Sequence, residues 1–285
     1  MSAARYAVLG NPVAHSRSPF IHAEFARQTG HDIRYGRVWC PMDGFEAAVR
    51  AFAASHEQGA GPALGCNVTI PFKFEAPRLA ARVSARAALA QAANVLRFDA
   101  DGWSADNTDG VGLVRDLQHN ADFDLAGARV LLIGAGGAAA GVLGPLVEAG
   151  VREIVVANRT LARAAALVER HRCALPRAAL RATELADCGE RFDLVINSSA
   201  SSVNGIAAPV EPTALREGTL AVDLMYGPPA EPFIAWAQTH GARGRDGLGM
   251  LVEQAAEAFG FWRGVRPHTA PVLQALRDHM ARGEA

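Results

Sequence analysis

The chain has 285 residues, of which 50% are hydrophobic and 20% charged, with 28 basic residues against 29 acidic ones. This length can bury one large or two medium cores, which excludes a small scaffold held together by disulfides or metals. The formal net charge of −1 argues against nucleic acid or an anionic membrane as a partner, because both need a strongly basic surface.

The cysteines and histidines do not follow metal-ligand spacing. The four cysteines, at positions 40, 66, 173 and 188, include no CxxC pair, and the nine histidines form no HExxH motif. We therefore expect reduced thiols and no metal site. The first ten residues have the pattern of a short strand and not that of a signal peptide, so we expect a cytoplasmic protein.

Short apolar runs alternate with amphipathic stretches over the first hundred residues, which predicts a βα fold with a mostly parallel sheet. The predicted strands are residues 6–9, 35–39 and 64–70, and the predicted helices are residues 19–29, 45–54 and a long alanine-rich segment from about 76 to 92. The polar turn DNTDG follows at residues 106–110, and we place a domain boundary at residue 108.

A second α/β unit with a clearer pattern follows this boundary. Its predicted strands are residues 129–133, 153–157, 194–197 and 220–223, and the predicted helices from here to the end of the chain are residues 111–120, 138–149, 161–171, 250–260 and 271–281. The uncharged run 130–147 is long enough to span a bilayer. Its five glycines and Pro145 contribute little to a favourable free energy of transfer from water into a bilayer, so we expect no membrane segment.

Gly134, Gly136 and Ala139 match the pattern G-x-G-x-x-(G/A) between a predicted strand and a predicted helix. Backbone amides and a helix N-terminus at such a turn can hold a pyrophosphate. The alternative is a tight packing turn, since the pattern alone is weak in a chain rich in glycine and alanine. The strand–turn–helix context favours a dinucleotide site.

The residues after the second strand of this unit predict which dinucleotide is bound. An NAD site places Asp or Glu there to accept hydrogen bonds from the adenine ribose, but this chain has Asn158. Arg159 and Arg163 follow, and two guanidinium groups suit a 2′-phosphate. We therefore expect NADP, the alternative being that both arginines belong to a solvated helix face.

Lys73 is the only lysine among the 28 basic residues. Arginine can replace lysine at most surface positions but cannot release a proton at working pH, so a lone lysine at a strand end suggests proton transfer or a need for the geometry of an ammonium group. The presence of a single lysine among so many arginines can also be due to chance. Polar residues at predicted strand ends and turns could line one crevice with it: Asn67, Thr69, Asn94, Asn107, Thr108 and Asp109.

With these motifs the chain resembles the shikimate dehydrogenase family over nearly its whole length. The matching segments are GNP at 10–12, HSRSP at 15–19, NVTIPFK at 67–73, AANV at 92–95, DNTDG at 106–110, GAGGA at 134–138, NRTLAR at 158–163, DLMY at 223–226 and DGLGMLVEQA at 246–255. The resemblance implies two α/β domains, with a Rossmann-type doubly wound NADP-binding domain (residues 109–246) inserted in a mostly parallel-sheet substrate domain (residues 1–108, completed by C-terminal helices at 247–285).

The resemblance also implies roles for individual residues. Lys73 and Asp109 would be the catalytic pair, and the substrate carboxylate would bind the Ser16 and Ser18 hydroxyls. The other implied substrate-binding residues are Asn67, Thr69, Lys73, Asn94, Asp109, Tyr226 and Gln254. The implied cofactor-binding residues are Gly134, Ala135, Gly136, Gly137, Ala138, Asn158, Arg159, Thr160, Arg163, Leu224 and Gly247.

The implied activity is the reversible NADPH-dependent reduction of 3-dehydroshikimate to shikimate in the chorismate pathway of aromatic amino-acid biosynthesis. Positions 85, 95, 140 and 224, here Ala85, Val95, Ala140 and Leu224, depart from the family's usual pattern. They leave open a paralogue acting on quinate or aminoshikimate. A non-catalytic module that senses a dinucleotide or metabolite is the alternative from another class, but such a protein would not need both Lys73 and Asp109. Whether the chain acts as a monomer or a homodimer is also left open.

Overall fold

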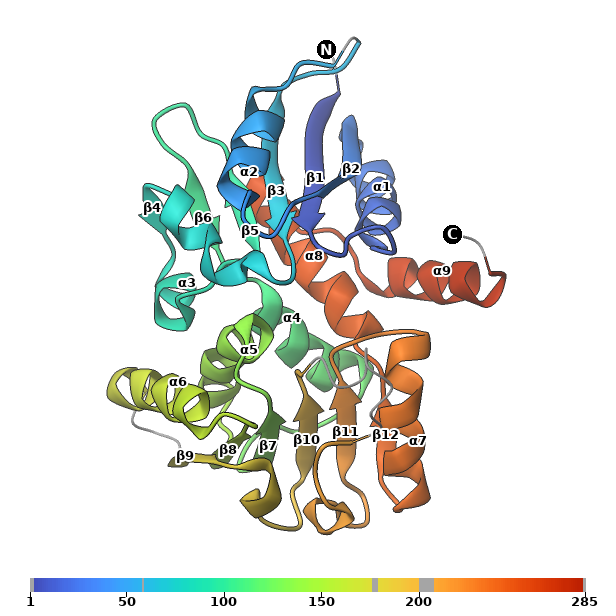
Figure 1. The fold of residues 1–285 in the computed structure, drawn as a ribbon. Helices are drawn as coiled ribbons and strands as arrows, with labels where there is room; N and C mark the ends of the chain where they lie inside the picture. Colours follow the sequence, from blue (N-terminus) through green and yellow to red (C-terminus); the bar gives the residue numbers. More distant parts are fainter. Residues whose placement is uncertain (1–2, 58, 176–178, 200–207, 284–285) are drawn as a thin grey trace. The chain divides into compact units, whose positions relative to one another are not determined.

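The computed structural model describes residues 3–57, 59–175, 179–199 and 208–283 (Figure 1). The chain divides into two compact units. Unit 1 consists of Met1–Gly112 and Leu251–Ala285, and unit 2 of Leu113–Met250. Each unit is built on its own six-stranded sheet.

The sheet of unit 1 has the strand order β2-β1-β3-β5-β6-β4. Its strands are β1 (Ala4–Gly10), β2 (Ile33–Trp39), β3 (Ala63–Val68), β4 (Arg82–Val83), β5 (Val95–Arg97) and β6 (Ser104–Asp106). Only β5 runs antiparallel to its neighbours β3 and β6, while β1 is parallel to both β2 and β3. The expectation of a mostly parallel sheet is confirmed.

Apolar side chains cover both faces of this sheet. The helices of the unit are α1 (Ser18–Thr29), α2 (Phe45–Ala54), α3 (Ala85–Ala90), the first four residues of α4 (Asp109–Arg115), most of α8 (Leu248–Arg263) and α9 (Ala270–Ala281). Every residue of β1 is buried, and its side chains alternate between two cores. Leu9 joins the core that contains Phe45 of α2, whereas Tyr6 packs with Trp262 of α8 at a ring distance of 4.6 Å.

All strands of unit 2 are parallel, in the order β12-β11-β10-β7-β8-β9. They are β7 (Arg129–Ile133), β8 (Glu153–Ala157), β9 (Ala179–Thr183), β10 (Leu194–Asn197), β11 (Leu220–Asp223) and β12 (Arg243–Arg245). The helices are α5 (Gly137–Glu148), α6 (Leu161–Ala174) and α7 (Glu231–Thr239). In this doubly wound order, successive strands are added first on one side of β7 and then, from β10 on, on the other side. Sheets of this kind bind nucleotides at the point where the strand order reverses, here between β7 and β10.

The prediction of one long helix from about residue 76 to 92 is wrong. The segment contains a 3₁₀ turn at Ala76–Leu79, the short strand β4 and only one α-helix, α3. Strand β4 pairs with β6, and the Ser84 hydroxyl caps α3 by accepting from the Ala87 amide at 3.2 Å. These contacts override the helix propensity of the alanines.

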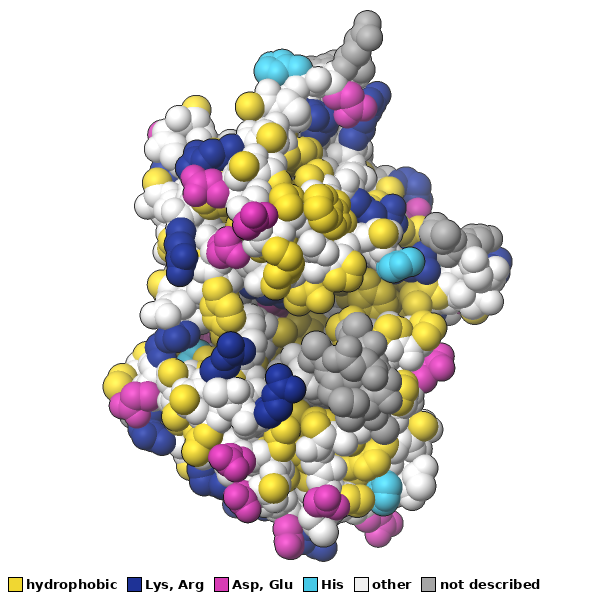
Figure 2. All heavy atoms as spheres, in the orientation of Figure 1, with side chains coloured by type: hydrophobic (Ala, Val, Ile, Leu, Met, Phe, Trp, Pro, Cys, Tyr) yellow, Lys and Arg dark blue, Asp and Glu magenta, His cyan; other side chains and the backbone are white. Residues whose placement is uncertain are grey.

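The uncharged run at 130–147 is divided between β7, a glycine turn and α5. Within the described part of the chain, no helix is long and apolar enough to cross a membrane. On the face drawn in Figure 2, described basic and acidic side chains are interspersed with apolar ones. This mixture agrees with the near-zero net charge.

Candidate active site

Lys73 and Asp109 form an ion pair in unit 1. Lys73 lies in the 3₁₀ turn Phe72–Phe74 shortly after β3, and Asp109 is the first residue of α4. The Lys73 Nζ donates to Asp109 Oδ2 at 2.6 Å, and the two side chains are 13% and 4% exposed. A short, largely desolvated pair of this kind fixes the ammonium group at one place.

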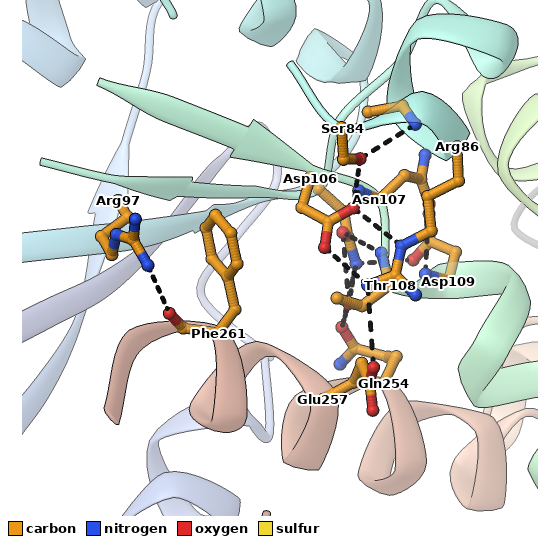
Figure 3. A network of polar contacts seen from close by, with 12 residues as sticks. Ser84, Arg86, Arg97, Asp106, Asn107, Thr108, Asp109, Gln254, Glu257 and Phe261 are labelled. Atoms are coloured by element: carbon orange, nitrogen blue, oxygen red, sulfur yellow. Dashed lines mark hydrogen bonds and ion pairs between the residues drawn. The ribbon is translucent and has the colours of Figure 1, made fainter. Parts of the chain in front are cut away.

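Asn94 holds the other oxygen of the same carboxylate. Its Nδ2 donates to Asp109 Oδ1 at 2.9 Å and to Gln254 Oε1 of α8 at 3.0 Å, while its Oδ1 accepts from the Thr108 amide at 2.8 Å. A Cβ atom on Gly112 of α4 would lie 2.6 Å from Gln254 Cβ. Glycine at this position therefore lets α8 approach closely enough for Gln254 to join the network drawn in Figure 3.

Asp106 anchors the turn that carries Asp109 (Figure 3). Its buried carboxylate accepts from Arg86 Nε at 2.7 Å, from Ser84 Oγ at 2.5 Å and from the Asn107 amide at 2.7 Å. Burial by itself would raise the pKa of Asp106, but the hydrogen bonds from Arg86 and Ser84 outweigh it and hold this pKa below its ordinary value. Asp106 is therefore ionised at neutral pH, paired with Arg86.

Asn67, near the end of β3, connects this network with β2. Its Nδ2 donates to the Asn94 carbonyl oxygen at 3.2 Å, and its Oδ1 accepts from the Tyr35 hydroxyl at 2.6 Å. Desolvation raises the pKa of Tyr35 well above its ordinary value, so the phenol stays protonated as a donor. Thr69 follows β3 directly, on the segment that leads to Lys73.

Ser16 and Ser18 lie at the start of α1, where the chain leaves β1. The Ser16 hydroxyl donates to the Ser18 hydroxyl at 3.1 Å and accepts from the Ser18 amide at 3.3 Å. Two adjacent hydroxyls can each rotate to donate to an acceptor placed between them. The pair can therefore serve an anionic group without carrying charge itself.

The glycine turn of unit 2 has the geometry that a pyrophosphate site needs. Gly134 has a φ of +106°, and its amide donates to the Ala157 carbonyl oxygen of β8 at 2.8 Å. A Cβ atom there would lie 2.8 Å from Ser198 Oγ, so both the backbone conformation and the packing require glycine. Helix α5 begins at Gly137, and the helix N-terminus follows the turn with its amides unused by side-chain caps.

Arg159 and Arg163 are exposed at the start of α6, directly beyond β8. Neither guanidinium group has a hydrogen-bond or ion-pair partner among the described residues. Asn158 donates from Nδ2 to the Thr160 carbonyl oxygen at 2.9 Å, which fixes the turn that presents both arginines. Two unpartnered cations at the end of the second strand fit a phosphate group.

Leu224 and Gly247 lie close together just beyond the ends of β11 and β12. The Leu224 amide donates to the Asn197 carbonyl oxygen at 2.9 Å, and the Gly247 amide donates to the Met225 carbonyl oxygen at 2.8 Å. A Cβ atom on residue 247 would lie 2.4 Å from the Leu224 carbonyl oxygen. Tyr226 lies on the same short segment after β11.

Three side chains that sequence reasoning missed, Tyr35, Asp106 and Arg86, belong to the polar network around Lys73 and Asp109. Tyr35 binds Asn67, and Asp106 with Arg86 supports the turn before Asp109. The spacing of Tyr35 within a predicted strand could have indicated which face it occupies, but not its partner. Asp106 was visible only as part of a polar turn.

Three family models match the chain. The shikimate dehydrogenase substrate binding domain matches residues 8–96, shikimate/quinate 5-dehydrogenase matches residues 116–228, and the shikimate 5′-dehydrogenase C-terminal domain matches residues 247–277. The order of these segments follows the division into two units, with the third match returning to unit 1.

Individual relatives agree with these matches. The NADP(+)-type shikimate dehydrogenase of Methylibium petroleiphilum is 63% identical over 96% of this chain and 94% of its own length. An Ael1 enzyme from Pseudomonas putida has 44% identity and a TM-score of 0.85, covering 96% of this chain and 98% of the neighbour. Shikimate 5-dehydrogenase of Thermus thermophilus, solved with NADP(H) and shikimate, has 30% identity and a TM-score of 0.81, covering 96% of this chain and 99% of that one.

Proposed function

Because this chain belongs to the shikimate dehydrogenase family, we propose that it catalyses the reversible NADPH-dependent reduction of 3-dehydroshikimate to shikimate, a step of aromatic amino-acid biosynthesis. The observation that carries the proposal is the Lys73–Asp109 ion pair of 2.6 Å, placed among amide and hydroxyl groups that suit a polyhydroxylated ring. A chain that only sensed a metabolite would have no need of a proton carrier.

We assign general acid–base catalysis to Lys73. In the direction of ketone reduction, an oxygen on the substrate gains negative charge, and the ammonium group can donate a proton to it. In the opposite direction, the neutral amine takes the proton from the hydroxyl group. Asp109 keeps the ammonium group in place through Oδ2, and Asn94 in turn fixes Asp109 through Oδ1.

Substrate binding falls to the polar groups around this pair. We assign the carboxylate to Ser16 and Ser18, whose hydroxyls are adjacent. We assign the ring hydroxyl groups to amide and hydroxyl side chains of the same unit and, on the family motif, to one tyrosine of unit 2: Asn67, Thr69, Asn94, Gln254 and Tyr226. Buried amides that bind hydroxyl groups discriminate strongly, because a substrate lacking the hydroxyl leaves them unpaired.

The residues of unit 2 fit NADP. NADPH, when bound, supplies the hydride. The turn from Gly134 to Ala138 would hold the pyrophosphate, and Arg159 and Arg163, together with Asn158 and Thr160, would hold the adenosine 2′-phosphate. Leu224 and Gly247 would lie beside the nicotinamide ring.

This assignment gives the two parts of the chain separate tasks. We propose that residues 1–108 and 247–285, together with Asp109 and Tyr226, bind the substrate and that the rest of residues 109–246 binds NADP. Reduced thiols and use of NADPH are typical of the cytoplasm, which we propose as the site of action. The substrate is a small molecule, in keeping with the near-neutral net charge.

The test is an oxidation assay with purified protein, using shikimate and quinate as alternative substrates and NADP⁺ and NAD⁺ as alternative cofactors. We expect shikimate with NADP⁺ to give the highest kcat/KM of the four combinations. Higher kcat/KM with quinate would show that the chain is a quinate-using paralogue instead. Binding of NADPH without oxidation of either substrate would support a sensing module instead.

A further inference from the structure

Arg37 of β2 binds the backbone of Ser16, one member of the serine pair. Its Nε and Nη2 donate to the Ser16 carbonyl oxygen at 3.0 and 2.7 Å. Its remaining nitrogen, Nη1, has no hydrogen-bond partner among the described residues. The guanidinium group therefore holds the peptide of a residue assigned to the substrate carboxylate, and both N–H donors of Nη1 remain unused among the described residues.

The register of β2 explains how Arg37 reaches this position. Arg37 pairs with Val8 of β1, so it lies near the carboxyl end of the sheet, where the chain continues toward Ser16. Side chains two residues apart on a strand share a face, and Tyr35 on that face binds Asn67. The same face of β2 thus contacts both the serine pair and the amide network around Lys73.

Within the described ranges, no carboxylate forms an ion pair with Arg37. Several other arginines of unit 1 pair with carboxylates. Arg34, which lies on the same strand as Arg37, pairs with Glu57 at 3.1 Å. Among the described residues, the Arg37 guanidinium group binds only the Ser16 carbonyl oxygen. Ser16 and Ser18 are neutral, so they cannot balance the charge of a bound carboxylate. The guanidinium group of Arg37, which binds the Ser16 carbonyl oxygen, can do so.

We propose that Arg37 is a specificity-determining residue that makes the site prefer a substrate with a carboxylate over an otherwise identical neutral one. This inference rests on the proposed function, because it takes Ser16 and Ser18 as the carboxylate subsite. Arg37 acts by placing its charge beside that subsite while holding the Ser16 peptide. Because the side chain is exposed, salt screens its effect.

The experiment measures KM for shikimate and the inhibition constant of shikimate methyl ester, a neutral analogue, as a competitor of shikimate oxidation. Both constants are measured in wild type, Arg37→Gln, Arg37→Lys and Arg34→Gln, at low salt and at about 0.5 M NaCl. Arg34→Gln is the matched control, since it removes one arginine from the opposite face of the same strand. KM for NADP⁺ reports on folding.

In Arg37→Gln we expect the preference for shikimate over the ester to fall about fivefold at low salt, the size typical of an exposed charge interaction. Arg37→Lys should keep most of the preference, and Arg34→Gln all of it. Salt should weaken shikimate binding in wild type but not in Arg37→Gln. If Arg37→Gln weakened shikimate and ester equally, Arg37 would merely support the Ser16 loop and the inference would be wrong. If the wild type did not oxidise shikimate at all, the proposed function would fail instead.

Discussion

Lys73 in unit 1 and the arginines Arg159 and Arg163 in unit 2 all follow a parallel strand, yet their surroundings differ. Lys73 is bound to Asp109 at 2.6 Å, and the carboxylate is 4% exposed. Asn94 holds the second oxygen of that carboxylate at 2.9 Å. Arg159 and Arg163, by contrast, are exposed and have no side-chain partner within the described ranges.

This difference matches two kinds of work. A group that transfers a proton must stand at a fixed place before the reaction, because moving it during the reaction would add to the barrier. A cation that only binds a phosphate can stay exposed to solvent in the free protein and form its hydrogen bonds when the phosphate binds. We therefore expect changes in unit 1 to alter turnover, and changes at the two arginines to alter cofactor affinity.

The largest effect should follow Lys73→Met, which removes the proton carrier that we propose but keeps most of the side-chain volume. General acid–base catalysis is typically worth about 10²- to 10⁴-fold, so kcat for shikimate oxidation should fall by about that factor. Arg50→Met is the control, because it removes a cation from an exposed pair with Glu46 in the same unit and should leave kcat unchanged. Undiminished turnover in Lys73→Met would remove Lys73 from the mechanism.

The next effect concerns cofactor choice. Each arginine should contribute about ten- to a hundredfold preference for NADP over NAD, because charge-assisted hydrogen bonds are worth about 1.5 to 3 kcal/mol each. The double variant Arg159→Ala, Arg163→Ala should lose NADPH affinity while its weak NADH activity barely changes. Arg172→Ala, on the same helix but paired with Glu169, should behave like wild type. Equal use of NADH and NADPH by the wild type would contradict this account.

A smaller effect should follow the replacement of both Ser16 and Ser18 by alanine. Each carboxylate oxygen left without a partner in a desolvated site costs about 1 to 3 kcal/mol. KM for shikimate should therefore rise strongly, with little change in NADP affinity, while Ser55→Ala in the same unit should change neither. If shikimate binding were unchanged and the double variant only less stable, the serines would serve the start of α1 alone.

The smallest effect concerns stability and pH. His22 is fully buried against the rings of Tyr35 and Phe25, and burial lowers its pKa to about 3 from 6.5. Below pH 6.5, His22 is protonated in the unfolded chain but stays neutral in the folded protein. The contribution of neutral, buried His22 to the free energy of unfolding is therefore fully present above pH 6.5 and is lost as the pH falls toward 3. The slope is about 1.4 kcal/mol per pH unit.

Urea unfolding at pH 7 and pH 5 measures this contribution. The wild type should lose about 2 kcal/mol more between these pH values than His22→Phe does, since phenylalanine has no proton to gain. The phenyl ring keeps the aromatic stack, so the variant should fold. Equal losses in both proteins would show that the pKa of His22 is not lowered in the folded protein.

The sequence predicted the longer elements of both units because their apolar periodicity extends over several residues. Strands β7, β8, β10 and β11 have the predicted bounds. The three-residue strands β5, β6 and β12 were missed, since so short a segment shows no alternation. Strand β9 at the edge of the sheet and α7 were also missed, and the alanine-rich segment was predicted as one helix although tertiary contacts divide it.

The candidate site was predictable to the extent that polar residues followed predicted strands. Lys73, Asn94 and Asp109 were singled out in this way, and they are in contact in the structure. Tyr35 and Arg37 were not, because they lie within a strand and reach the site through the pairing of β2 with β1. Sequence spacing does not reveal such long-range pairing without the register.

The division between a preformed catalytic pair and an open phosphate site is tested most directly by the Kd of NADPH, measured by fluorescence titration of two variants. For Lys73→Met we predict a Kd within about twofold of wild type, because Lys73 lies outside the residues that we assign to the cofactor. For Arg159→Ala, Arg163→Ala we predict a Kd at least about a hundredfold higher. Similar losses of NADPH affinity in both variants would contradict the division, since Lys73 would then act in cofactor binding.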